Sequence, residues 1–194
     1  PASGAAAAFS PNGSTIATAA LDGSVQFWDG AGNLLNTATA TDEVYWLAWR
    51  PDSSQLAYTG REGAVTILDA ASATPVLAIP LSDTGMSVAW NATGGQILAG
   101  TESGAAVYDS GSGSQLFAIA DASGTSTLSA AWSPGGDRIA LGTSDIGALL
   151  VDAFSGTLIN TLPANGAATG VAWNANNGQL ATSNDNGSIE VWAP

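Results

Sequence analysis

An aromatic residue that closes a short apolar run recurs five times along the chain, at intervals of 40, 41, 42 and 41 residues. The five positions are Phe9, Trp49, Trp90, Trp132 and Trp173. An aliphatic residue follows each of them by seven positions, at Ile16, Leu56, Ile97, Ile139 and Leu180. A period of this length indicates a tandem array of one small unit, because such a unit buries its apolar faces only against its neighbours.

Each unit divides into short strands separated by turn residues. A glycine that favours a tight turn follows the aliphatic position at Gly23, Gly63, Gly104, Gly147 and Gly187. Runs such as TIATA at 15–19 and SVQFWD at 24–29 flank the first of these glycines, and no helical periodicity is sustained over ten residues. The pattern therefore predicts an all-β protein with four strands in each unit.

Four units end their third strand with an acid after an apolar residue, and in the first unit this pair is Trp28-Asp29. The period, the aromatic-Ser-Pro-x-Gly turn and the closing Trp-Asp together resemble the WD-repeat (WD40) family of β-propellers. The resemblance implies one domain, residues 1–194, built as a β-propeller of five four-stranded blades. The expected repeats are 5–43, 44–84, 85–126, 127–167 and 168–194.

Many members of this family join a Gly-His pair and a turn aspartate to the tryptophan in a buried hydrogen-bond network. This chain contains no histidine, so that network cannot form. Asp22, Asp145 and Asp185 occupy the turn position, and we expect them to bond backbone amides of their turns.

The last repeat ends after its third strand, so the final blade lacks its outer strand within the chain. The expected third strand, with Ile189, Glu190, Val191 and Trp192, then has an unpaired edge, and such edges recruit other chains. Three interpretations follow from this. The ring closes with a three-stranded last blade; or the five units belong to a larger ring; or strand donation between subunits makes an oligomer or filament.

The side chains of the sequence exclude many activities. Three basic residues stand against 16 acidic ones, for a net charge of −13, so binding to nucleic acid or insertion into a membrane is not expected. The chain has no cysteine, histidine or lysine, which removes the usual nucleophiles, bases and zinc ligands. We expect no catalytic residue, no metal and no cofactor. The low content of charged residues, 10%, favours an extracellular or cell-surface location over a cytoplasmic one.

One departure from the repeat suggests a binding site. Three residues before the recurring aromatic, four units carry Ala, Ser or Gly. The second unit instead carries Trp46, after Asp42, Glu43 and Tyr45. An aromatic beside acids in a loop is suited to a cation, a sugar ring or a peptide side chain. The alternative is that Trp46 fills space between the first two blades.

The sequence thus predicts a non-catalytic protein-interaction or scaffold module. Its partner is another protein or further copies of itself, bound through the unpaired edge strand. The alternative function is a receptor for carbohydrate or small cations that uses the loop around Trp46.

Overall fold

The computed structural model describes residues 4–122, 124–164, 166–176 and 178–193. Within these ranges the chain forms nineteen β-strands and one short 3₁₀ helix, η1 (Ala120–Ala122). The strands form four four-stranded sheets and one three-stranded sheet, in which successive strands pair antiparallel. The predicted all-β fold with a three-stranded last unit is confirmed.

The sheets follow one another along the chain, and each is called a blade. The strands of the first blade are β1 (Gly4–Phe9), β2 (Thr15–Ala20), β3 (Ser24–Asp29) and β4 (Leu34–Thr39). The strands of the second blade are β5 (Val44–Trp49), β6 (Gln55–Gly60), β7 (Ala64–Asp69) and β8 (Pro75–Pro80). The strands of the third blade are β9 (Gly85–Trp90), β10 (Gln96–Thr101), β11 (Gly104–Asp109) and β12 (Gln115–Ala118).

The last two blades differ in their number of strands. The strands of the fourth blade are β13 (Thr127–Trp132), β14 (Arg138–Thr143), β15 (Ala148–Asp152) and β16 (Leu158–Leu162). The strands of the fifth blade are β17 (Ala168–Trp173), β18 (Leu180–Asn184) and β19 (Ile189–Trp192). Strand β19 pairs with β18 on one side only, whereas the equivalent strand of every other blade is paired on both sides.

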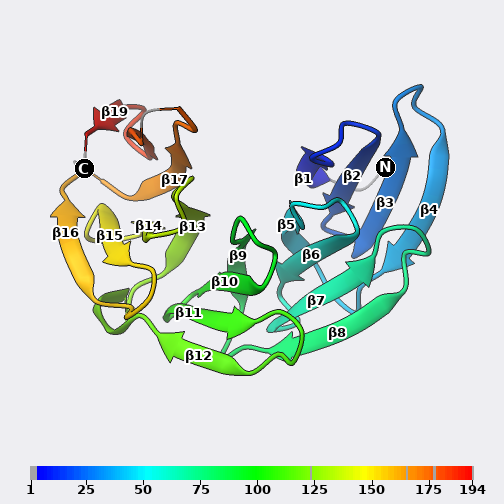
Figure 1. Cartoon of the computed structure of the whole chain (residues 1–194), viewed down its shortest axis with the longest axis horizontal. Coiled ribbons are helices and arrows are strands. Elements are labelled where there is room, and N and C mark those ends of the chain that lie inside the picture. The colour runs from blue at the N-terminus through cyan, green and yellow to red at the C-terminus, as the bar shows by residue number, and fades with distance from the viewer. Residues whose placement is uncertain (1–3, 123, 165, 177, 194) are drawn as a thin grey trace.

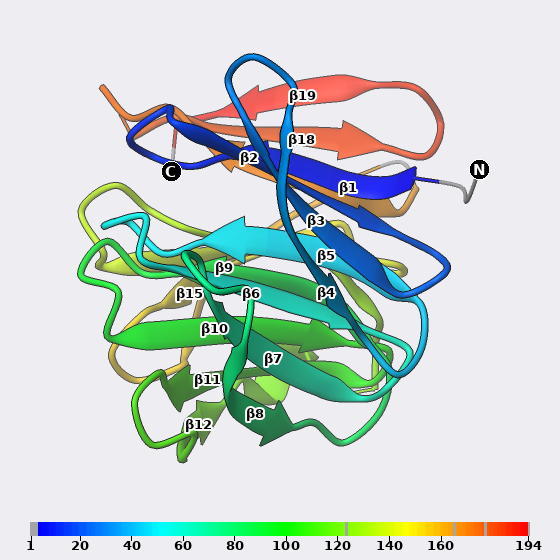
Figure 2. The ribbon, with the colours of Figure 1, turned by 90° about the vertical axis from the view of Figure 1, so that its right-hand side faces the viewer.

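The five blades are arranged in an open arc (Figure 1). The first strand of each blade lies on the inside of the arc, and the fourth strands lie on the outside. Consecutive inner strands pack on one another from β1 to β17, but no comparable contact joins β17 to β1 among the described residues. A five-bladed ring closed within one chain, one of the three interpretations above, is therefore not the arrangement found. Figure 2 views the arc from the side of its first blade.

The apolar core lies between consecutive blades, as the repeat predicts. Four clusters of buried residues fill the four interfaces. An indole also reaches back to the preceding inner strand: Nε1 of Trp49 donates to the Ala8 carbonyl at 3.1 Å, and Nε1 of Trp90 donates to the Ala48 carbonyl at 3.1 Å. Trp173 makes the same bond to Ala131 at 3.3 Å. Each blade is thus held by its neighbours and not by a core of its own.

Candidate functional site

The predicted binding loop is only partly a loop. Asp42 and Glu43 lie in the connection from β4 to β5, but Tyr45 and Trp46 are inside β5. The register of β5 against β6 shifts between Val44 and Trp46, so Tyr45 is the extra residue of a β-bulge. The bulge explains why the sequence did not reveal the strand boundary, since a bulge interrupts the two-residue alternation.

Tyr45 and Glu43 form a small polar network at this end of β5. The Tyr45 hydroxyl donates to Oε2 of Glu43 at 2.6 Å, and the Arg61 guanidinium lies 3.6 Å from the same oxygen. The hydrogen bond to Glu43, followed by desolvation, raises the pKa of the Tyr45 phenol. The Glu43 carboxylate is therefore already paired within the chain, with the Arg61 guanidinium and the Tyr45 hydroxyl.

Trp46 is half-buried and packs against the cluster between the second and third blades, which includes Ala57, Val88 and Trp90. The packing alternative had placed it between the first two blades, and this is corrected: Trp46 pairs with Thr59 and faces the third blade. Its role as a ligand anchor stays a prediction.

The three turn aspartates have different surroundings. Oδ1 of Asp22 accepts hydrogen bonds from the Ser24 amide at 3.0 Å and from the Ser24 hydroxyl at 2.7 Å, and these bonds lower the pKa of Asp22. Oδ2 of Asp145 instead accepts from the Thr125 hydroxyl at 3.1 Å, across the connection between the third and fourth blades. Asp185 donates its amide to the Ala167 carbonyl at 3.0 Å.

The carboxylates divide between the two rims of the arc. The turns between the second and third strands and the connections between blades share one rim, called here the acidic rim, because antiparallel strands bring them to the same end. Among described side chains, the acids on this rim are Asp22, Asp42, Glu43, Glu62, Asp83, Glu102, Asp145 and Asp185. Arg61 is its only described cation, so this rim carries most of the net negative charge.

The opposite rim contains the aspartates that end the third strands. The Asp69 carboxylate accepts hydrogen bonds from the amide and the hydroxyl of Ser72, at 2.9 Å and 2.8 Å, and Asp109 and Asp152 bond Ser112 and Ser155 in the same way. These bonds lower the pKa of each carboxyl and close the turn into the outer strand.

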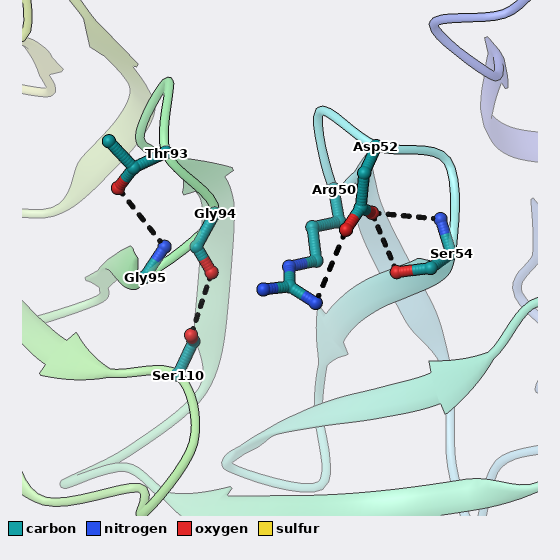
Figure 3. Close-up of polar contacts among 7 residues, drawn as sticks. All are labelled: Arg50, Asp52, Ser54, Thr93, Gly94, Gly95 and Ser110. Carbon is teal, nitrogen blue, oxygen red and sulfur yellow. Dashed lines mark hydrogen bonds and ion pairs between the residues drawn. The ribbon is translucent and has the colours of Figure 1, made fainter.

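Arg50 lies on the same rim, between the second and third blades (Figure 3). Its guanidinium lies 5.8 Å from the centroid of the Trp90 ring and 3.4 Å from the Asp52 carboxylate. In the third blade, the Ser110 hydroxyl donates to the Gly94 carbonyl at 2.8 Å. Arg50 thus covers the end of the interface that Trp90 fills.

A cavity of about 780 Å³ lies between the second and third blades, and the sequence patterns did not reveal it. It extends from Ser82 and Ser103, at the acidic rim, past Ala106 to Tyr108. Three alanines in one cross-strand row, Ala99, Ala106 and Ala118, are the sequence signal that could have predicted it.

The predicted assembly edge has two distinct faces. The side chains of Glu190 and Trp192 point toward the fourth blade: Glu190 accepts from Nδ2 of Asn184 at 3.3 Å, and Nε1 of Trp192 donates to Thr182 at 3.2 Å. Ile189 and Val191 point the other way and are 74% and 65% exposed. At the other end of the arc, Phe9 is 68% exposed, although Trp49 and Trp90 at the equivalent positions are 8% exposed.

In the described part of the chain, no group of three or more acidic, histidine or cysteine residues is arranged to hold a metal ion. Nor does any helix there have the length and apolar composition needed to cross a membrane.

Comparison with known proteins supports the repeat assignment. The family described as "WD domain, G-beta repeat" matches residues 5–29 and 156–193, so these two segments carry WD40 repeats. No curated protein matches the sequence. The chain is similar in fold to a chain of the solved structure "Crystal Structure of Mitotic Checkpoint Complex", with a TM-score of 0.89 and 20% identity. The alignment covers 98% of this chain and 61% of that one, so the present sequence spans about three fifths of that chain's length.

Proposed function

We propose that this WD40-repeat chain is a non-catalytic protein-interaction module that associates head to tail with further copies of itself. WD40 propellers typically act as protein-interaction scaffolds, and the similar solved chain belongs to a complex. The surfaces that support self-association are the outward faces of the first and fifth blades. Fold alone does not identify a partner, so the proposal depends on the residues of these two faces.

The exposed face of the fifth blade corresponds to a face that is buried elsewhere in the same molecule. Ile189 and Val191 occupy the positions that Val25 and Phe27 occupy in the first blade. Val25 and Phe27 are completely buried under the second blade, whereas Ile189 and Val191 are exposed. This contrast is the single observation that carries the proposal, because exposed apolar patches of this kind mark interaction surfaces.

The complementary surface is on the first blade. In each internal interface, the aromatic that ends one inner strand packs on the preceding blade, as Trp49 packs on the first blade. Phe9 is the one such aromatic without a preceding blade, and the strand that contains it also leaves Ala5 and Ala7 exposed. The first blade of a second copy can therefore pack on the exposed face of the fifth blade, as the second blade packs on the first within one chain. Because the two faces differ, the contact is heterologous and repeats from copy to copy.

The unpaired edge of β19 adds a second way to hold the neighbour. Its outward N–H and C=O groups have no partner strand in the described residues, and an added strand would complete the blade. Glu190 points toward the fourth blade, so no charged side chain of β19 lies on the outward face.

Sedimentation velocity over a range of protein concentrations tests this proposal. We expect the mass to rise above that of the 19.1 kDa monomer as concentration increases. Changing Ile189→Lys and Val191→Lys together should hold the protein at the monomer mass. Phe154→Ser is the matched control, since Phe154 is equally exposed but lies in the turn between β15 and β16. A wild-type chain that stays monomeric at every concentration, or a control variant that dissociates as fully as the lysine variant, contradicts the proposal.

A further inference from the structure

The cavity between the second and third blades exists because one wall is lined by small residues. Ala106 and Ala118 line this wall, and Ala99 continues their cross-strand row on the face of the third blade that meets the second. The fourth-blade residues equivalent to Ala99 and Ala106 are Leu141 and Leu149, both buried, which fill the interface with the third blade. The volume of about 780 Å³ is within the range of ligand-binding pockets.

Tyr108 gives this cavity a polar group without a partner. Its side chain lines the cavity and is 7% exposed, yet its hydroxyl makes no hydrogen bond to any described residue. The hydroxyl oxygen is not itself fully buried, so it is accessible from the cavity and available to a ligand. In the first and fifth blades the residue at this position, Trp28 or Trp192, bonds a threonine of its own sheet. The residue equivalent to this threonine in the third blade is Ala99, whose side chain offers no acceptor.

The mouth of the cavity is negatively charged. Asp83 follows the lining residue Ser82 and accepts hydrogen bonds from the Ser103 hydroxyl and, at 3.1 Å, from the Glu102 amide. The three arginines form their ion pairs with other acids, so Asp83 has no cationic partner in the described part of the chain. Burial, followed by the charge of Asp83, raises the pKa of Tyr108.

We propose that this cavity binds a basic side chain, arginine or lysine, of a partner polypeptide. The aliphatic part of the side chain lies along Ala106, Ala118 and Leu81, as the stems of basic residues commonly do on apolar surfaces. The cationic group lies between Asp83 and Tyr108, where it pairs with the carboxylate and donates to the phenol oxygen. The other carboxylates of the acidic rim draw the partner toward the mouth. This inference rests on the proposed role as a protein-interaction module and names the chemistry of one partner.

A capped pentapeptide with one arginine between alanines is the probe, and its citrulline counterpart is the uncharged control. Amide chemical shifts of the ¹⁵N-labelled protein report the titration, with the largest changes expected at Ser103, Gly104 and Ala106. We expect the arginine peptide to bind at least about tenfold more tightly than the citrulline peptide, because citrulline keeps the shape but loses the charge. Equal affinity for the two peptides, or no shift with the arginine peptide, overturns the inference.

Variants locate the binding to the cavity. Ala106→Leu should weaken arginine-peptide binding at least tenfold, because a leucine there fills the cavity. Leucine is the residue at the equivalent position of the fourth blade, Leu149. Tyr108→Phe, which removes only the hydroxyl, should weaken it by about threefold to tenfold. Ala31→Leu, at an exposed turn, is the control for the added volume and should bind as the wild type does. Unchanged affinity in both cavity variants overturns the inference, and circular dichroism spectra verify that each variant is folded.

The same titration in the Ile189→Lys, Val191→Lys background separates the two proposals. If that variant is monomeric and still binds the arginine peptide, both stand. If the wild type never associates but binds the peptide, only head-to-tail assembly fails; if it associates but does not bind, only the cavity proposal fails.

Discussion

Two tryptophans at equivalent positions should respond in opposite ways to the same substitution. Nε1 of Trp90 donates to the Ala48 carbonyl, whereas Nε1 of Trp132 is buried with no hydrogen-bond partner in the described structure. Phenylalanine keeps an aromatic ring at either position and removes the indole N–H. Trp90→Phe therefore deletes a bond between blades, and Trp132→Phe deletes an unsatisfied donor.

The magnitudes follow from these contacts. The smaller ring gives up roughly 40 Å² of buried apolar surface, which is about 1 kcal/mol at either position. Trp90→Phe also loses a hydrogen bond worth about 1 kcal/mol, so we expect it to lower the free energy of unfolding by about 2 kcal/mol. Trp132→Phe recovers a desolvation penalty of about 1–3 kcal/mol, so its net effect should lie between about zero and a stabilisation of about 2 kcal/mol.

Urea denaturation followed by far-ultraviolet circular dichroism measures both variants on one scale. The two free energies of unfolding should differ by about 2–4 kcal/mol, which corresponds to a difference in Tm of roughly 4–16 °C for a chain of this size. Equal losses in the two variants would mean that ring size alone matters, and would refute the hydrogen-bond argument.

Two further predictions concern a turn and a glycine. Hydrogen bonds from Ser72 lower the folded-state pKa of Asp69, so its stabilisation is complete above the unfolded value of about 3.9 and is lost as the pH falls through the folded pKa. The Tm of Asp69→Asn should therefore lie below that of the wild type at pH 7, and the gap should close in acid; a gap independent of pH would contradict this. A Cβ on Gly100 would lie 2.6 Å from Cγ2 and 2.7 Å from the carbonyl oxygen of Thr127, so Gly100→Ala should cost about 1–3 kcal/mol by overpacking. Gly30→Ala, with open space around it, serves as the control in thermal denaturation, and a loss as large there would contradict the steric argument.

The architecture could be predicted from the sequence because every blade repeats the same apolar positions. The aromatics and the alanines before them, such as Trp49 and Ala48, indicated which faces meet, and the four internal interfaces contain them. The three-stranded sheet β17-β18-β19 could be predicted in the same way, by comparing the last repeat with the others.

The candidate sites were less predictable, because they depend on contacts between repeats. Trp46 stood out in the sequence, but its packing against the third blade follows from the register around a bulge. The Tyr108 cavity depends on Ala106 and Ala118, which lie on different strands and are adjacent only across the sheet. The open arc depends on the angle between blades, which no local pattern records.

The arc also has a consequence for how the molecule loses its structure. Each internal blade is supported on two sides, but the first and fifth blades each have one neighbour, so fluctuations should begin at the two ends and progress inward. Amide hydrogens of the third blade, the most remote from both ends, should exchange with solvent most slowly. A second molecule that covers the first or the fifth blade would then slow amide hydrogen exchange in blades that it does not contact.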